Sequence, residues 1–393
     1  MSDQYFLVLD VGTTGVKALV FDTDDTVRAR AYEPIAKKMP QEGWVEQDPD
    51  EFIRAARGVL AEAVKKSGVS PDAIISMGIA NQRETVVAWD LRDGTALAPA
   101  IVWEDSRTED WCRTFYSDSV DRVREKTGLM LTSTFSAPKI HWLLDAVPAV
   151  ADAAAAGTLA VGTVDSWVLF SLSREQRHMT DITNASRTLL YNINGHKWDR
   201  ELLELFALDR DMLPAVRSSR ALYGTLDPEI CGNQIPIEVI CGDQQASMAA
   251  AGFAPRTTKI TYGTGTFIMQ TLGDEFVLED PFITTLTPSA SIGSVQYALE
   301  ASVRETGSRV AGVLGDEEAT ERVLEDIVQE VDVLLQQLPY PVATVIVDGG
   351  ISQSEYLVRR QGELSNAEIV RQPIFDGTAL GVKRLLSSIH HGT

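Results

Sequence analysis

The chain has 393 residues with 44% hydrophobic and 23% charged side chains, which is ordinary for a globular protein of two or three domains. Its formal net charge of −21 at pH 7 opposes contact with nucleic acid and with anionic membrane surfaces, so we expect neither as a partner. No apolar run is long enough to span a membrane, the N-terminus lacks the basic start of a signal peptide, and three cysteines show no paired spacing, so we expect a cytoplasmic protein without disulfides or a zinc site.

Apolar runs typical of strands alternate along the chain with stretches of helical spacing. We predict strands over residues 5–10, 16–21, 74–80, 235–240, 259–262, 266–271 and 344–347. We predict helices over residues 48–66, 244–251 and 316–338, one that ends in the Ala-rich stretch 146–156, and a last one that begins at residue 377.

A strand–turn–strand unit occurs twice. Residues 5–10, a Gly/Thr turn and residues 16–21 are echoed by residues 259–262, a second Gly/Thr turn and residues 266–271. The echo predicts two related domains. We place their boundary near residue 240, so that residues 1–240 form an N-terminal domain that binds polyol and phosphate and residues 241–393 form a nucleotide-binding domain.

The first turn, GTTG at residues 12–15, directly follows Asp10. Backbone N–H groups in such a turn, together with hydroxyls of Thr13 and Thr14 and the ammonium of Lys17, can hold phosphate oxygens. The carboxylate of Asp10 can hold Mg²⁺, through water. The alternative is a plain hairpin, for which Gly-Thr turns are common, but the second turn at residues 263–265 favours the phosphate site.

Two further polar groups follow predicted strands. Arg83 and Glu84 offer one donor fork and one acceptor, which suit a small molecule with several hydroxyls. Taken alone, an Arg-Glu pair is more often a solvated ion pair. Asp243 can act as a general base in phosphoryl transfer, with Gln244 beside it as a hydroxyl partner, although an Asp here can also simply cap the next helix. Trp103 and Phe267 can form apolar walls of the site or be ordinary core aromatics.

These motifs together resemble those of the FGGY carbohydrate kinases, and within them most closely the glycerol kinases. The resemblance covers residues 5–300 and 344–384. Its most specific parts are residues 81–85 (NQRET), 100–103 (AIVW), 162–167 (GTVDSW), 180–188 (TDITNASRT) and 242–245 (GDQQ). Pentulose kinases of the same family differ at residues 82–84, so a ketopentose is the less expected substrate.

The resemblance implies an α/β protein of two actin-like (ribonuclease H-like) domains with a central cleft. It also implies ATP and Mg²⁺ as cofactors and phosphorylation of a terminal hydroxyl of glycerol or a similar polyol. The implied polyol contacts are Arg83, Glu84, Trp103, Asp243, Gln244 and Phe267, with Asp243 as the base. The implied phosphate contacts are Thr13, Thr14, Lys17, Gly263 and Thr264; Gly350, Ile351 and Ser354 would seat adenine, and Asp10 and Asp243 would hold Mg²⁺.

The chain departs from the glycerol kinases at three places. Thr134 stands where they have a substrate-contacting Tyr, which leaves space for a larger polyol, and Ser354 stands where they use Asn. Residues 301–343 are far fewer than the matching stretch, which normally helps to cover the nucleotide. Two alternatives therefore stay open: a kinase for another polyol or sugar, and a degenerate kinase that binds a polyol with little turnover. The oligomeric state also stays open.

Overall fold

The computed structural model describes residues 4–115 and 117–390, which form two compact units. Unit 1 comprises Met1–Asp243, Pro288–Ser294 and Val382–Thr393, and unit 2 comprises Gln244–Thr287 and Val295–Gly381. The division of labour predicted for residues 1–240 and 241–393 stays a prediction.

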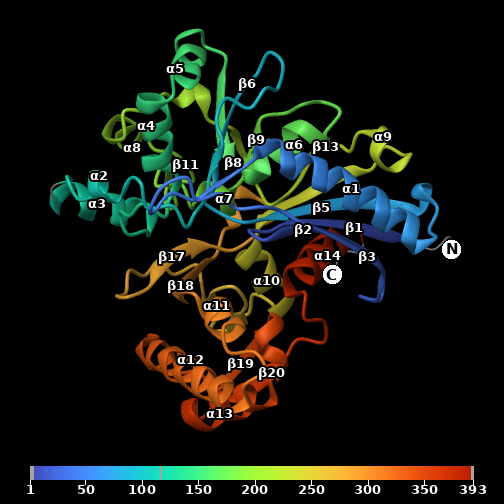
Figure 1. Ribbon diagram of the computed structural model, residues 1–393, viewed down its shortest axis with the longest axis vertical. Helices are drawn as coiled ribbons and strands as arrows, with labels where there is room; N and C mark the ends of the chain where they lie inside the picture. The colour runs from blue at the N-terminus through green and yellow to red at the C-terminus, as the bar shows by residue number, and fades with distance from the viewer. Residues whose placement is uncertain (1–3, 116, 391–393) are drawn as a thin grey trace. The chain divides into compact units, whose positions relative to one another are not determined.

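The strands alternate with helices along the chain (Figure 1). The strands are β1 (Tyr5–Val11), β2 (Gly15–Asp22), β3 (Val27–Pro34), β4 (Glu46–Gln47), β5 (Ile74–Asn81), β6 (Val86–Asp90), β7 (Ala100–Ile101), β8 (Leu159–Thr163), β9 (Met179–Asp181), β10 (Tyr191–Asn192), β11 (Lys197–Trp198), β12 (Ala215–Arg217), β13 (Arg220–Thr225), β14 (Pro236–Gly242), β15 (Thr258–Tyr262), β16 (Thr266–Gly273), β17 (Ile283–Leu286), β18 (Tyr297–Val303), β19 (Thr344–Asp348) and β20 (Glu368–Arg371). The α-helices are α1 (Pro49–Ser67), α2 (Glu109–Cys112), α3 (Ser117–Thr127), α4 (Ser136–Ala146), α5 (Pro148–Ala155), α6 (Val164–Leu172), α7 (Ile182–Ala185), α8 (Arg200–Leu205), α9 (Pro228–Cys231), α10 (Asp243–Ala251), α11 (Thr306–Ala311), α12 (Glu317–Gln337), α13 (Glu355–Ser365) and α14 (Gly377–His390).

The main sheet of unit 1 has the strand order β13-β14-β5-β1-β2-β3. Strands β1, β2 and β3 are antiparallel neighbours, whereas β1, β5 and β14 run parallel. In this register Asn81, the last residue of β5, lies between Val11 of β1 and Gly242 of β14. The carboxyl ends of three parallel strands therefore meet at one edge, which is where ligands bind in open α/β sheets.

Helices cover both faces of this sheet. Leu7 and Leu9 join a buried apolar cluster with α1, which Figure 1 shows along the strands. Phe6 points to the opposite face, because side chains alternate along a strand, and its ring lies 6.0 Å from that of His390 in α14. On the same face a Cβ at Gly78 would lie 2.3 Å from Val382, so glycine lets α14 approach β5 closely.

The sheet of unit 2 has the order β17-β18-β16-β15-β19-β20. Its strands β18, β16 and β15 are antiparallel, and β15, β19 and β20 are parallel. The order β18-β16-β15-β19-β20 thus repeats β3-β2-β1-β5-β14 of unit 1. The predicted α/β class and the predicted echo of a strand–turn–strand unit are confirmed.

The predicted helices are all present. Helix α1 begins after Asp48, whose side chain accepts the N–H of Asp50, and α12 begins after Asp316, whose side chain accepts the N–H of Ala319. The prediction of a helix that ends within the Ala-rich residues 146–156 is confirmed, because α5 ends at Ala155. A further helix end lies at Ala146, where α4 stops. Pro148 lacks the N–H that would continue α4, so it begins the next helix instead.

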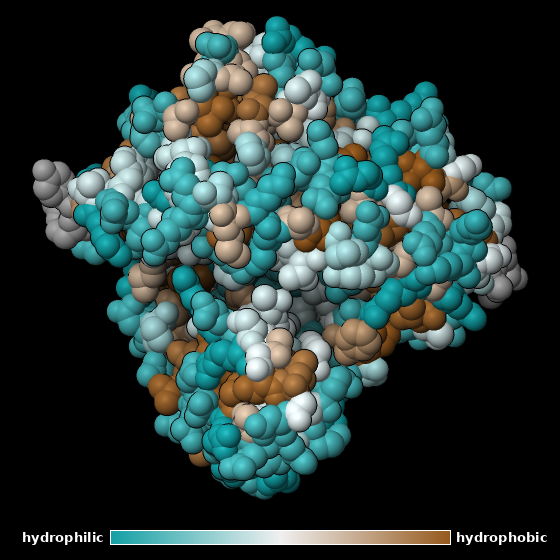
Figure 2. All heavy atoms as spheres, in the orientation of Figure 1, coloured by the Kyte–Doolittle hydropathy of each residue, from teal (hydrophilic) through white to brown (hydrophobic). Residues whose placement is uncertain are grey.

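Hydrophilic residues cover most of the face in view in Figure 2, in line with the net charge of −21. Within the described residues, no helix combines the length and the apolar character that crossing a membrane requires.

Candidate active site

Four predicted site residues come together at the strand ends of unit 1. Asp10 is the penultimate residue of β1, Arg83 and Glu84 follow β5, and Asp243 follows β14. Nε of Arg83 lies 3.2 Å from Oδ1 of Asp243, so residues 160 positions apart in the chain form an ion pair. The side chain of Arg83 is 3% exposed and that of Asp243 28% exposed, which leaves the carboxylate open to a ligand.

Glu84 lies beside this pair in a constrained backbone. Its φ is 63°, in the left-handed region that a non-glycine residue adopts only when its surroundings hold it there. Glu84 is 4% exposed, and its Oε1 accepts Nε–H of Arg187 at 2.5 Å. The alternative of a solvated Arg83–Glu84 ion pair is therefore wrong, because both side chains are buried.

The first Gly/Thr turn closes with a hydrogen bond from Gly12 N to Gly15 O at 3.0 Å. The indole N–H of Trp103 donates to Oγ1 of Thr13 at 3.0 Å, and Nε2 of Gln47 donates to the carbonyl of Thr13 at 2.8 Å. Trp103 is half-buried and joins the turn to the strand ends rather than lying in the core. Thr14 is exposed beside it.

Lys17 lies across from Asp10 in the β1–β2 hairpin, with Nζ 3.0 Å from Oδ2 of Asp10. Asp10 and Asp243 both lie at the carboxyl edge, and the negative charge of each helps to raise the pKa of the buried Cys241 thiol in β14, after the larger effect of burial. No group of three or more His, Cys, Asp or Glu side chains that could hold a metal occurs among the described residues. Two carboxylates still fit Mg²⁺, which is usually bound by one or two carboxylates with water and substrate phosphates.

Thr134 is half-buried, and Lys139 of α4 forms a hydrogen bond with its backbone. The ammonium of Lys139 donates to the carbonyl oxygens of Thr134 and Phe135, the latter at 3.1 Å. Lys139 is fully buried, and this burial lowers its pKa to about 7. Oγ of Ser136 donates to the carbonyl of Glu84 at 3.1 Å, which joins this segment to the polar strand ends.

In unit 2 the second turn repeats the first. Gly263 N donates to Gly265 O at 3.1 Å, and Gly307 N donates to the carbonyl of Thr264 at 3.0 Å. Phe267 lies half-buried in β16, and Gln244 is buried in α10. Because the structure describes the two units separately, the approach of Gln244 and Phe267 to the unit 1 residues stays a prediction.

The predicted adenine seat follows β19. Gly349 has a φ of 87°, and a Cβ there would lie 2.3 Å from the carbonyl oxygen of Tyr262, so only glycine fits. Gly350 is exposed and Ile351 half-buried. Ser354 caps α13, since its hydroxyl accepts the N–H of Leu357 at 3.3 Å. Their contact with a nucleotide stays a prediction.

The model of the FGGY family of carbohydrate kinases, N-terminal domain, matches residues 5–250 of this chain. The chain belongs to this family. The chain is 43% identical over 318 residues to a protein named glycerol kinase from Burkholderia cenocepacia, an alignment that covers 79% of the chain and 62% of that relative. The chain thus spans 62% of the length of the curated relatives it matches first.

Among solved structures, the chain resembles Plasmodium falciparum glycerol kinase with ADP, with a TM-score of 0.89, 25% identity, and coverage of 98% of this chain and 90% of the other. A ligand-bound xylulose kinase from Lactobacillus acidophilus shares the fold, with a TM-score of 0.84, 15% identity and coverage of 99% and 90%. The predicted family and the actin-like fold type are confirmed.

Sequence reasoning missed several residues that hold the candidate site together. Lys139 and Arg187 each contact a predicted site residue, and Gln47 supports the first turn. The signal for Arg187 was available, because it lies in the family-specific stretch 180–188. Lys139 follows Thr134 by five residues and carries no pattern that distinguishes it from a surface lysine.

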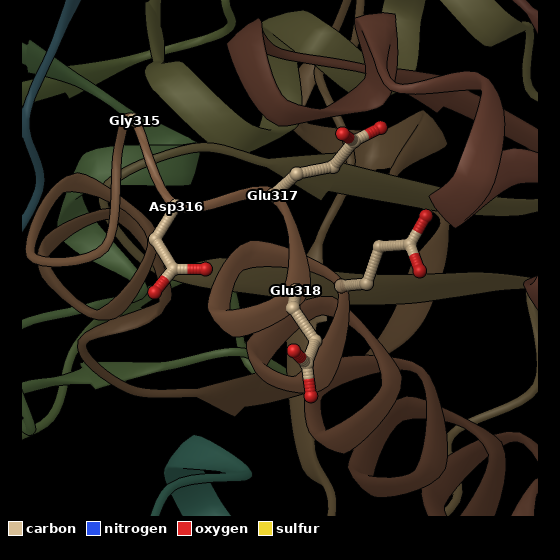
Figure 3. A pocket seen from close by; sticks show the side chains of 5 residues that line it. Gly315, Asp316, Glu317 and Glu318 are labelled. Atoms are coloured by element: carbon tan, nitrogen blue, oxygen red, sulfur yellow. The ribbon is translucent and has the colours of Figure 1, made fainter.

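A hollow of about 680 Å³ in unit 2 is lined by Gly315, Asp316, Glu317, Glu318 and Glu321 at the start of α12. Figure 3 shows that the carboxylates of Asp316, Glu317 and Glu318 point in different directions rather than toward one centre. Their charge repels phosphate, so we assign this hollow no part in the FGGY site.

Proposed function

We propose that this FGGY kinase chain transfers the γ-phosphoryl group of ATP to a terminal hydroxyl of glycerol or a similar small polyol. The observation that carries the proposal is the Arg83–Asp243 ion pair beside the buried Glu84. This arrangement places the partly exposed carboxylate of Asp243 next to one hydrogen-bond donor, Arg83, and one acceptor, Glu84, for polyol hydroxyls. The 43% identity to a protein named glycerol kinase supports a polyol rather than a ketopentose.

In this mechanism Asp243 is the general base. Its carboxylate takes the proton of the attacking hydroxyl while the oxygen forms a bond to the γ-phosphorus and the bond from that phosphorus to the β–γ bridging oxygen breaks. The products are the polyol phosphate and ADP. Arg83 lies 3.2 Å from Oδ1 of Asp243 and orients the carboxylate.

Arg83, Glu84 and Gln244 position the polyol. A donor and an acceptor on opposite sides of a hydroxyl-rich molecule hold it in one orientation, and such orientation supplies much of the rate in a reaction with little covalent chemistry for the protein. Trp103 and Phe267 provide apolar walls against the carbon chain.

The phosphates of ATP would bind at Thr13, Thr14, Lys17, Gly263 and Thr264, and adenine at Gly350, Ile351 and Ser354. Asp10 and Asp243 would hold Mg²⁺. The ion, when bound, neutralises phosphate charge. Local cations and N–H donors are needed because the net charge of −21 opposes an anionic nucleotide.

Thr134 favours a polyol larger than glycerol as the second candidate substrate, because its side chain is smaller than the Tyr of the glycerol kinases. A cytoplasmic location belongs to the same proposal, since ATP is available there and three buried cysteines are free thiols. We leave open whether the chain forms a homo-oligomer.

The test is ADP release by the purified chain with ATP and Mg²⁺ on a panel of glycerol, longer polyols, xylulose and ribulose. We expect the highest kcat/KM with glycerol or another polyol. Xylulose as the best substrate by a wide margin would contradict the substrate class. Polyol binding without any ADP release would favour the degenerate kinase instead.

A further inference from the structure

Residues 180–188 of unit 1 contact three parts of the proposed site: the end of β14, the end of β5 and Glu84. It contains α7, a short helix whose residues are all buried, and Asp181 caps it by accepting the N–H groups of Thr183 and Asn184. Oγ of Ser219 donates to the same carboxylate at 2.6 Å. Asp181 thus fixes the segment from within, and three side chains of the segment reach three different parts of the site.

Thr183 holds the strand that ends at the base. The N–H of Gly242 donates to Oγ1 of Thr183 at 2.9 Å, and that hydroxyl donates in turn to Asp181. The pairing of β13 with β14 begins at Arg220 and Val239 and does not reach Gly242. The Thr183 hydroxyl therefore accepts the Gly242 N–H in place of a carbonyl from a neighbouring strand. Gly242 directly precedes Asp243.

Asn184 holds the end of β5. Its amide exchanges two hydrogen bonds with the amide of Asn81, at 2.9 Å and 3.1 Å, and both side chains are fully buried. Nδ2 of Asn81 also donates to the carbonyl of Gln82 at 2.8 Å. The turn that presents Arg83 is thereby anchored to α7.

Arg187 holds Glu84. The 2.5 Å contact joins two side chains that are 4% and 5% exposed, and the guanidinium carbon lies 5.3 Å from the ring centre of Phe135. A charge-assisted contact between buried groups is directional, so it fixes the rotamer of the carboxylate as well as its charge.

We propose that Thr183, Asn184 and Arg187 are positioning residues that set the base and the polyol acceptor from one rigid segment. The inference rests on the proposed function. It assigns Thr183 to the placement of Asp243, and hence to kcat, and Arg187 to the placement of Glu84, and hence to the KM for polyol.

The experiment compares Thr183→Val, Thr183→Ser and Arg187→Lys with the matched control Thr188→Val. Thr188 is a buried threonine of the same stretch whose hydroxyl donates to the carbonyl of Ala185 and accepts the N–H of Leu190 at 3.1 Å. We expect Thr183→Val to lower kcat roughly tenfold or more with little change in KM for polyol, and Thr183→Ser to restore kcat.

Arg187→Lys retains the charge but loses the planar donor, so we expect KM for polyol to rise roughly tenfold while KM for ATP changes little. Equal kinetic effects of Thr183→Val and Thr188→Val would overturn the role of Thr183. A normal KM for polyol in Arg187→Lys would overturn the role of Arg187.

A second readout separates this inference from the proposed function. Hydrogen exchange of the Gly242 amide should be faster in Thr183→Val than in Thr188→Val, and this measurement needs no turnover. Absence of polyol phosphorylation by the unaltered chain would reject the proposed function alone. Unchanged exchange at Gly242 would reject the positioning role, whatever the activity.

Discussion

The two sheets share one strand order but differ in the chemistry at their carboxyl edges. In unit 1, the Arg83–Asp243 pair leaves a carboxylate 28% exposed. In unit 2, Asp348 at the carboxyl end of β19 pairs with Lys259 of β15, 2.6 Å apart with both side chains 2% exposed. Oγ of Ser247 completes the second pair by donating to Oδ2 of Asp348 at 2.5 Å.

The same strand order thus carries charged pairs with two different roles. A buried, fully paired charge fixes structure and has no capacity left for a ligand, whereas a partly open one can exchange its partner for a substrate group. Loss of charge at the edge of unit 1 should thus reduce turnover, and loss at the edge of unit 2 should reduce stability.

The largest effect is expected for Asp243→Asn. The amide keeps the shape but cannot accept the proton, so kcat should fall by roughly 10²–10⁴ while the melting temperature changes little. Steady-state assays of ADP release and a thermal melt measure the two quantities. Near-normal turnover would remove Asp243 from the mechanism and break the comparison.

Asp348→Asn is the counterpart in unit 2. It leaves the buried ammonium of Lys259 without its carboxylate, which costs about 3–5 kcal/mol of unfolding free energy. Urea denaturation of the variant against the unaltered chain measures the loss. A change below about 1 kcal/mol would show that this pair is not structural and that the contrast between the edges is wrong.

Arg83→Ala sharpens the role of the first edge. It removes a charged donor beside Glu84 and Asp243, a loss of about 1.5–3 kcal/mol in transition-state binding, or roughly 10- to 150-fold in kcat/KM for polyol. The control is Arg92→Ala, since the Arg92 side chain is 69% exposed and pairs with Asp90 at the end of β6, in a different sheet from β5 and β14. Similar kinetics of both variants would contradict a role for Arg83.

The buried Lys139 should make the stability of unit 1 depend on pH. Burial lowers the pKa of Lys139 to about 7, and its charged neighbours Glu84, Asp105, Cys112 and Arg107 modify this shift. In the unfolded chain a lysine has a pKa of about 10.4. Between these values the unfolded chain binds more protons than the folded chain, so stability from this group rises with pH, by at most about 1.4 kcal/mol per unit. Two N–H donors remain on the neutral amine for the two carbonyls.

The measurement is the unfolding free energy between pH 7 and pH 8.5, and Lys139→Met is the control that removes the titrating group. We expect a steeper rise with pH in the unaltered chain than in the variant. Parallel curves would mean that Lys139 does not titrate in this range.

The smallest effect concerns nucleotide choice in unit 2. Ser354 uses its hydroxyl to cap α13, and we expect residues 301–343 to give a bound nucleotide little cover, so the shared triphosphate contacts should supply most of the affinity. We expect Kd values for ATP and GTP within about tenfold of one another, by calorimetry with Mg²⁺. Strong selectivity for adenine would show that α12 has replaced the missing cover.

Local sequence patterns were sufficient for the elements that the sequence predicted in both units. The apolar run before Asp10, the cap at Asp48 and the helical spacing after Asp316 depend on neighbours within a few residues, and each predicted element is present. The helix end at Ala146 was not predicted, although Pro148 is a local signal for the start of a new helix.

The sequence by itself determined the fold class, the family and the identity of the polar groups at the strand ends, because strand period, turn residues and motifs are local. Only the tertiary structure decided which groups meet. The pairs Arg83–Asp243 and Glu84–Arg187 join residues 160 and 103 positions apart. Lys139 donates a hydrogen bond to the carbonyl of Thr134. Such contacts follow from the register of β5 with β14 and from the packing of α4 and α7, which no local pattern in a single sequence encodes.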